Sequence, residues 1–135
     1  MRADDDIEHT ECYDALKLLR SHTYITVLTM LRHGPRRPSE MDQATRTWVL
    51  GDRWAQTTRR IRHSQIVDAL HALTAIGLVE RRELTTGFRR SVEYSLTLAG
   101  EECLAALDQL RHWVRRNPTI LDNAITHYHQ TRGHH

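Results

Sequence analysis

The sequence predicts a mainly α-helical protein with one β-hairpin, in the α+β class. Apolar residues recur at three- and four-residue spacing in several segments, a pattern typical of helices that bury one face. Two short strand-like runs, LVERREL and SVEYSL, flank a turn that contains Gly87. A chain of 135 residues has the size of a single domain. We therefore expect the helices and the hairpin to share one core.

Two helices are expected before the first strong break in the chain. Apolar side chains share one face over residues 12–19, and a second short helix spans residues 24–31. His33-Gly34-Pro35 ends the second helix, because glycine and proline both oppose its continuation. The acidic residues 1–10 are expected to form an N-terminal tail.

A third short helix is expected to begin at Pro38-Ser39, with Ser39 as the N-cap and Asp42 three residues on, and to run to about Arg46. The segment that follows, residues 47–58 (TWVLGDRWAQTT), combines a turn signal at Gly51-Asp52 with several large apolar residues. Because these residues are too apolar for a solvated loop, we expect the segment to pack down onto the protein. Its tryptophans, Trp48 and Trp54, then serve as hydrophobic anchors or line a small-molecule pocket.

The clearest helix comes next and ends at Gly77. Its apolar face contains Ile66, Ala69, Leu70, Leu73 and Ile76, and its opposite face contains Ser64, Gln65, Asp68 and His71. The hairpin follows, with Gly87 supplying a positive φ in the turn over residues 85–90.

A long helix is expected after the hairpin. Thr97 offers an N-cap, Glu101 and Glu102 suit the positive end of the helix dipole, and Asn117-Pro118 ends the helix after about Arg116. A last amphipathic piece runs from Ile120 to about Tyr128. These boundaries divide the chain into the acidic tail (1–10), a domain with its flanking helices (11–116), and a C-terminal helix and tail (117–135).

The positive charge of the chain is concentrated in its middle. The formal net charge is only +2, yet residues 32–90 contain twelve arginines against six acidic residues. Lys17 is the only lysine, and arginine is the better donor to phosphate oxygens and guanine edges. An arginine bias of the source genome would scatter these residues evenly, so their concentration favours a nucleic-acid partner.

Several classes of protein and site are not indicated. The sequence has no apolar run long enough to span a bilayer and no secretory signal, so we expect no membrane partner and a cytoplasmic location. It has no phosphate-binding glycine loop, no GxSxG and no HExxH, so we expect neither an enzyme nor a metal or cofactor site despite ten histidines. The two cysteines, Cys12 and Cys103, form no CxxC pair, and we expect both to be reduced thiols.

The order of three helices and then a two-stranded hairpin is that of a winged helix-turn-helix, in which one helix enters the major groove of DNA and the hairpin lies along the backbone. Basic residues occupy three places that this fold brings to DNA: the turn before the motif, the start of the helix that ends at Gly77, and the hairpin tip. These candidate DNA-binding residues are Arg36 and Arg37, then Arg59, Arg60, Arg62 and His63, and finally Arg89 and Arg90. Each pair taken alone is more commonly a solvated surface patch, but three patches in these three elements favour DNA binding.

Three segments carry a resemblance to a known family. They are LRHGPRRPSEM (31–41), ALTAIGLVERRE (72–83) and VEYSLTLAGEECLAALDQLRHW (92–113). With them the chain resembles the HxlR-type winged-helix transcriptional regulators of bacteria, relatives of the MarR-like group, over most of residues 12–116. The resemblance implies a homodimer that binds a pseudo-palindromic operator, with N- and C-terminal dimerisation helices and an association with the nucleoid.

The chain is longer than this family between Glu40 and Gly77, by about a dozen residues that the segment 47–58 must absorb. The helix that ends at Gly77, called the recognition helix because it is the one expected in the major groove, then has two possible starts. If it begins near Arg62, then Ser64, Gln65 and Asp68 face the bases; if it begins near Thr58, then Arg59 and Arg62 do.

The resemblance also includes a cysteine ahead of the first predicted helix, here Cys12, a candidate redox thiol. Its acidic neighbours Glu11 and Asp14 disfavour a reactive thiolate, so a packing role is the stronger interpretation. Cys103, for which we expect a packing role, belongs to an apolar stripe with coiled-coil-like spacing, Cys103, Leu107, Leu110 and Val114. The stripe packs either on its own domain or on a second subunit, and we favour the dimer interface.

Two alternatives to a transcriptional regulator remain at this point. One is a winged-helix protein that binds DNA in a plasmid, phage or chromosome-maintenance system. The other is a protein-interaction module whose contact site is the segment Trp48–Trp54. A small-molecule effector is compatible with the regulator, and the sequence does not identify it.

Overall fold

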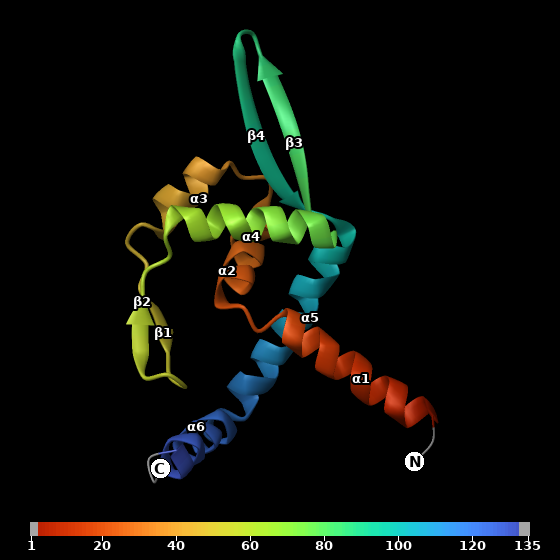
Figure 1. Ribbon diagram of the computed structural model, residues 1–135, viewed down its shortest axis with the longest axis vertical. Coiled ribbons are helices and arrows are strands. Elements are labelled where there is room, and N and C mark those ends of the chain that lie inside the picture. The colour runs from red at the N-terminus through yellow and green to blue at the C-terminus, as the bar shows by residue number, and fades with distance from the viewer. Residues whose placement is uncertain (1–2, 133–135) are drawn as a thin grey trace.

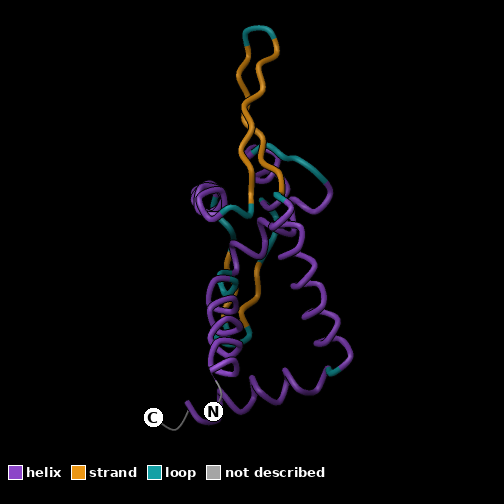
Figure 2. Tube along the Cα trace, turned by 90° about the vertical axis from the view of Figure 1, so that its right-hand side faces the viewer, coloured by secondary structure: helices purple, strands orange, loops and turns teal. Residues whose placement is uncertain are grey.

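The computed structural model describes residues 3–132, which form six α-helices, one 3₁₀ turn and two antiparallel hairpins (Figure 1). In chain order the elements are α1 (Ala3–Leu18), α2 (His22–Met30), η1 (Leu31–His33), α3 (Pro38–Thr45), β1 (Leu50–Asp52), β2 (Thr57–Arg59), α4 (His63–Ile76), β3 (Val79–Thr86), β4 (Arg89–Leu96), α5 (Leu98–Arg116) and α6 (Pro118–Arg132). The fold is mainly helical with a winged helix-turn-helix at its centre, as the sequence predicts. Figure 2 shows the β3–β4 hairpin reaching beyond the helices at one end of the molecule.

The core lies between α2, α3, α4, the N-terminal half of α5 and the root of the β3–β4 hairpin. Its buried side chains include Leu28, Leu31, Met41, Ile66, Leu70, Leu73, Val79, Tyr94 and Leu104. Burying each aliphatic side chain of this size contributes about 1.5–3 kcal/mol. Four of the five residues predicted for the apolar face of α4 are buried, whereas the fifth, Ile76 in the last turn, is 46% exposed.

The first helix is longer than the sequence indicates. The predicted helix began at residue 12 after an acidic tail, whereas α1 begins at Ala3 and takes residues 3–10 with it. The physical reason is that acidic residues are favourable in the first turns of a helix, and no glycine or proline interrupts this stretch. Every described side chain from Asp6 to Leu18 is exposed, so α1 adds nothing to the core. Residues 1–2 lie outside the described part of the chain.

Both helices of the central motif begin with the same local hydrogen bond. The Arg37 N–H donates to Glu40 Oε1 (3.0 Å) at the start of α3, and the Arg62 N–H donates to Gln65 Oε1 (2.9 Å) at the start of α4. The predicted Ser39 cap is wrong, because Pro38 already occupies the first helical position, which has no need of an N–H donor. Of the two predicted starts of the recognition helix, the one near Arg62 is confirmed, since α4 begins at His63.

The hairpin β3–β4, called the wing from here on, is fastened at its root. Tyr94 and Arg36 exchange two backbone hydrogen bonds (2.9 and 2.8 Å), so residue 36 forms a one-residue third strand. Thr97, the predicted N-cap of α5, accepts from the Gly100 N–H (3.1 Å) and donates to the Gly77 carbonyl (2.7 Å). Pairing continues from Val79↔Leu96 to Thr86↔Arg89, beyond the predicted runs, which leaves Gly87-Phe88 as a two-residue turn.

The hairpin β1–β2 is called the strap from here on. It lies in the segment around residues 47–58, which the sequence predicts to pack down onto the protein. Only Leu50 packs against the core, while Trp48 (41%), Val49 (55%) and Trp54 (44%) stay substantially exposed. Asp52 Oδ1 accepts from the Trp54 and Ala55 N–H groups (3.0 and 3.1 Å), which turns the chain at the strap tip. The expectation of a packed segment is therefore wrong: three-residue strands joined by a turn project away from the core instead of covering it.

The strap tip reaches α6 instead. Arg53 Nη2 and Asp122 Oδ1 form an ion pair (2.6 Å), and His129 Nε2 lies 2.8 Å from the Arg53 carbonyl oxygen. The rings of Trp54 and Tyr128 meet edge to face, with centroids 5.4 Å apart. Trp54 is thus an anchor, although to the C-terminal helix and not to the core.

The predicted stripe on α5 divides into two parts. Cys103 and Leu107 pack against the core, whereas Leu110 is 47% exposed. Arg32 fastens η1 to this helix through a bidentate ion pair with Asp108 (2.7 and 2.8 Å). None of the described helices is both long and apolar enough to cross a membrane.

Candidate nucleic-acid interface

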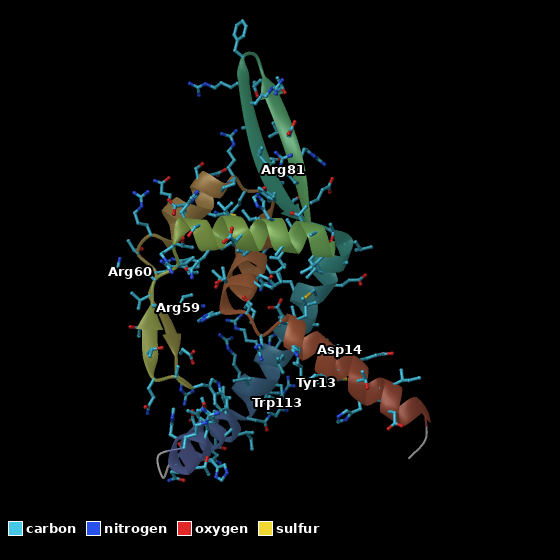
Figure 3. The ribbon with its side chains drawn as sticks, viewed as in Figure 1. Tyr13, Asp14, Arg59, Arg60, Arg81 and Trp113 are labelled. Atoms are coloured by element: carbon cyan, nitrogen blue, oxygen red, sulfur yellow. The ribbon has the colours of Figure 1, made fainter. Side chains whose placement is uncertain are left out.

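The start of α4 gathers exposed basic side chains from two helices. Arg60, Arg62 and His63 precede or open α4, and Arg46 follows α3, which packs against α4. Arg37 is exposed at the other end of α3, next to Arg36 and the wing root. Figure 3 shows Arg59 and Arg60 at the junction between the strap and α4. Because the first N–H groups of a helix have no partner in the helix and its dipole is positive there, this end of α4 attracts anions even before its side chains are counted.

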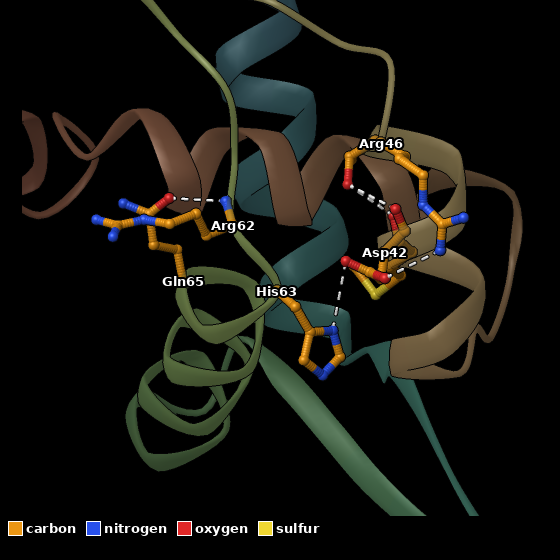
Figure 4. A network of polar contacts seen from close by, with 7 residues as sticks. Asp42, Arg46, Arg62, His63 and Gln65 are labelled. Atoms are coloured by element: carbon orange, nitrogen blue, oxygen red, sulfur yellow. Dashed lines mark hydrogen bonds and ion pairs between the residues drawn. The ribbon is translucent and has the colours of Figure 1, made fainter.

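Asp42 organises part of this cluster, as Figure 4 shows. Its carboxylate lies 3.5 Å from His63 Nδ1 and 3.7 Å from Arg46 Nη2. The Arg60 Nη1 group makes a long hydrogen bond to the Arg46 carbonyl oxygen (3.4 Å). Asp42 therefore lies between His63 and Arg46 at the junction of α3 and α4, and partly offsets the charge of Arg46.

The outward face of α4 presents polar side chains of short reach. Ser64 and Asp68 are exposed, and Gln65 is half-buried. The Gln65 carbonyl oxygen is occupied by the Arg62 N–H, which leaves its amide NH₂ group as a donor. This face can thus offer a hydroxyl, an amide donor and a carboxylate acceptor to base edges in a major groove.

The wing places its two terminal arginines on opposite faces. Neighbouring residues of a strand point to opposite sides, and the register pairs Arg89 with Thr86 and Arg90 with Thr85. Both side chains are exposed, and neither enters an ion pair among the described residues. Nearer the root, Arg81 Nη1 binds Glu83 Oε1 (3.1 Å), a hydrogen bond that raises the pKa of Arg81 above its ordinary value.

The predicted basic residues do not all fall in one place. Arg36 uses its backbone to extend the wing, and its side chain is half-buried. Arg59 belongs to strand β2 of the strap, opposite Leu50, and the strap hangs from α4 on the side away from the wing (Figure 1). The role of each residue in DNA binding stays a prediction.

Three basic residues of this surface were missed in the sequence. Arg46 joins the cluster only because α3 packs on α4, which its position in the chain does not reveal. Arg81 and Arg82 lie within the run predicted as the first strand of the hairpin. Side chains alternate between the two faces of a strand, and this alternation is the signal in the sequence that places the two arginines on opposite faces of the wing.

The two thiols lie far from this cluster. Cys12 is exposed on α1, and Cys103 is half-buried against the core, where burial raises the pKa of its thiol. Trp54 also lines a hollow between the strap, α2 and α6, together with Arg20, His22, Arg53, Leu121 and Ile125. Within residues 6–132, no group of three or more His, Cys, Asp or Glu side chains is placed to hold a metal ion.

Solved structures share this fold. A transcriptional regulator of the MarR family from Enterococcus faecalis V583 superposes with a TM-score of 0.68 at 23% identity, covering 85% of this chain and 92% of its own. The reduced form of the regulator YodB from B. subtilis gives 0.62 at 21% identity, covering 77% and 88%. Bacillus subtilis PadR, solved in complex with operator DNA, gives 0.50 at 24% identity, covering 62% and 45%.

No curated protein matches the chain. A family model does: the one described as HxlR-like helix-turn-helix matches residues 18–120, from the end of α1 to the start of α6. This match contains both helices of the motif, the strap, the wing and α5, and it agrees with the resemblance carried by the three sequence segments. The chain therefore belongs to the HxlR-like helix-turn-helix family.

Proposed function

We propose that this protein is a transcriptional regulator that binds a pseudo-palindromic DNA operator as a homodimer and works at the bacterial nucleoid. The observation that carries the proposal is the pair of exposed basic surfaces on the central motif, one at the start of α4 and one at the wing tip. A winged helix-turn-helix brings these two places to the same duplex. PadR, a protein with a similar fold, was solved in complex with operator DNA, which supports DNA binding by this protein.

In this proposal α4 reads sequence and the arginines hold the backbone. Ser64, Gln65 and Asp68 face base edges in the major groove, where the Gln65 amide donates to purine acceptors and Asp68 accepts from cytosine. Arg60 and Arg62, beside the helix start, bind phosphates together with the unpaired N–H groups of α4. Arg89 and Arg90 bind backbone at the neighbouring groove.

Exposed apolar side chains on the terminal helices support the homodimer. They include Ile7, Tyr13 and Leu16 on α1, Leu110 and Trp113 on α5, and Ile120 on α6. Figure 3 shows Tyr13 and Trp113 in the half of the molecule away from the wing. A two-fold dimer through these helices would hold two α4 helices at adjacent turns of one duplex face, about 34 Å apart.

The test is DNA binding measured as a function of salt. Footprinting on the DNA upstream of the gene should reveal two protected half-sites, and log K should fall linearly with log salt concentration. The double variant R89A/R90A should weaken binding to every sequence about equally, with the salt slope reduced by about 2. Q65A or R62A should change sequence preference instead.

The matched control is R115A/R116A, which removes the same charge from the end of α5. It should leave the affinity and the salt slope close to those of the parent, with the oligomeric state followed by sedimentation. If R89A/R90A binds as tightly as the parent at moderate salt, the proposed mode of binding is wrong. Binding to no duplex even at low salt would favour the protein-interaction module.

A further inference from the structure

The wing tip carries an aromatic side chain that nothing in the fold explains. Phe88 is the only phenylalanine of the chain, and it is the most exposed of the large apolar residues, at 109% of its reference value. It follows Gly87, whose φ of 64° makes the two-residue turn possible. Turn positions of this kind usually take polar residues, because an apolar ring here only orders water around it.

Phe88 differs from the other exposed apolar side chains. The six named above for the dimer lie on α1, on the C-terminal half of α5 and on α6, in the half of the molecule away from the wing. Trp48, Val49 and Trp54 lie in or beside the strap, on the other side of α4. The ring at the wing tip is therefore outside the dimer contact and needs another partner.

The charge around Phe88 indicates what that partner is. Residues 84–92 (LTTGFRRSV) contain two arginines and no acidic residue, and the nearest acids, Glu83 and Glu93, lie further down the strands. A ring followed by two cations, with no acid beside it, fits a polyanion that also offers flat apolar surfaces. Stacked bases between two phosphate backbones are such a surface.

The length of the wing brings this tip to the groove next to the one that α4 occupies. Each strand has eight residues, and at a rise of about 3.3 Å per residue the tip stands about 25 Å from the wing root. The root is fixed to the C-terminal end of α4 through Gly77 and Leu78. A wing of this reach passes the phosphate backbone that borders the major groove.

We propose that Phe88 inserts into the minor groove beside each half-site and partly unstacks one base step. This inference rests on the proposed function and deepens it. Arg89 and Arg90, on opposite faces of the wing, bind the phosphates of the two strands that border the groove, so the ring is centred between them. Apolar wedges of this kind kink the duplex toward the major groove.

The inference predicts sequence preference at positions that α4 does not contact. Pyrimidine–purine steps such as TA and CA unstack most easily, so each half-site should be flanked by such a step at a fixed distance. The two wings of a dimer should bend the DNA symmetrically.

The experiment uses the full-length protein and a duplex from the footprinted upstream region, with 2-aminopurine at each flanking adenine in turn. The parent protein should raise 2-aminopurine fluorescence at one position per half-site, and energy transfer between dyes at the duplex ends should report a bend. F88A should abolish both signals and lower the affinity roughly tenfold for each half-site, as expected for the loss of one base stack in each. F88L, which keeps an apolar wedge, should retain the bend and most of the affinity.

The control is L98A, which removes another exposed apolar side chain (71%) from the start of α5 and should change neither signal. Because Phe88 contacts nothing in the fold, F88A should keep the circular dichroism spectrum and melting temperature of the parent. If the parent protects its half-sites while F88A gives the same affinity and fluorescence, the wedge is wrong and the proposed function stands. If F88A changes only the association state of the protein, Phe88 contacts protein and the wedge is overturned. If the parent binds no duplex, the proposed function fails, and the wedge with it.

Discussion

The two hairpins of this protein enclose the recognition helix, and they are fastened at opposite ends. The strap precedes α4 and has three-residue strands, and its tip is held by α6. The wing follows α4 and has eight-residue strands, and its root is held by the core while its tip is in solvent. The end that is fixed decides what each hairpin can do: the strap links two parts of the protein, and the wing reaches outward.

The difference arises from what each strand pair can bury. The wing root places Val79 and Tyr94 in the core and gains a third strand at Arg36. In the strap only Leu50 packs against the core, so the position of the strap depends on the polar and aromatic contacts of the strap tip. Such partly exposed contacts are individually weak compared with core burial.

The largest expected effect is at the wing root. A Cβ at Gly100 would overlap the carbonyl oxygen of Leu78, a backbone atom that cannot move without shifting the wing. G100A should therefore lower the free energy of unfolding by about 3 kcal/mol, measured by urea denaturation. G51A in the strap is the matched control, because its Cβ would meet nothing within 4 Å and its φ is not positive. If G51A lowered the free energy of unfolding as much as G100A does, the wing root would not be held more firmly than the strap.

The next effect is at the two hairpin tips. W54A removes the edge-to-face contact with Tyr128 and should lower the free energy of unfolding by about 1 kcal/mol. F88A at the wing tip should leave stability unchanged, since that ring is fully exposed. Thermal denaturation of the two variants in one buffer checks this. The strap would not be a link if W54A melted at the temperature of the parent.

A smaller effect concerns the ion pair between Arg32 of η1 and Asp108 of α5, and it depends on pH. The hydrogen bond from Arg32 holds the pKa of Asp108 below its ordinary value of 3.8. A carboxylate with a depressed pKa in the folded state stabilises the protein above its unfolded pKa, and this contribution is lost as the pH falls through the folded pKa. The melting temperature of the parent should therefore drop more steeply than that of D108N as the pH is lowered below 3.8. Parallel curves would show that the pair does not contribute.

The smallest effect is expected for the ion pair of the strap. The Arg53 and Asp122 side chains are 58% and 60% exposed, against 33% and 29% for Arg32 and Asp108. A double-mutant cycle with R53A and D122A should give a coupling of about 0.5 kcal/mol, which 0.5 M salt should largely screen. A coupling that survives salt would mean that the Arg53–Asp122 pair is not screened as an exposed ion pair.

Local signals predicted much of the fold correctly. Gly77 ends α4, Thr97 caps α5, and Gly87 turns the wing, because each acts on hydrogen bonds or dihedral angles within a few residues. The buried face of α4 followed from apolar spacing alone. The start of α4 was one of two alternatives, since an arginine whose N–H binds the glutamine three residues later is not among the usual capping residues.

The sequence by itself determined the order of helices, the wing and the basic character of the motif, since these depend on periodicity, turn chemistry and charge within short stretches. The tertiary structure alone decided where the strap leads, because its contacts join Arg53 and Trp54 to residues about seventy positions later in α6. It also decided that Arg46 and His63 share Asp42, and that Phe88 has no partner within the described fold. Such contacts depend on the path of the whole chain, and no local pattern contains that path.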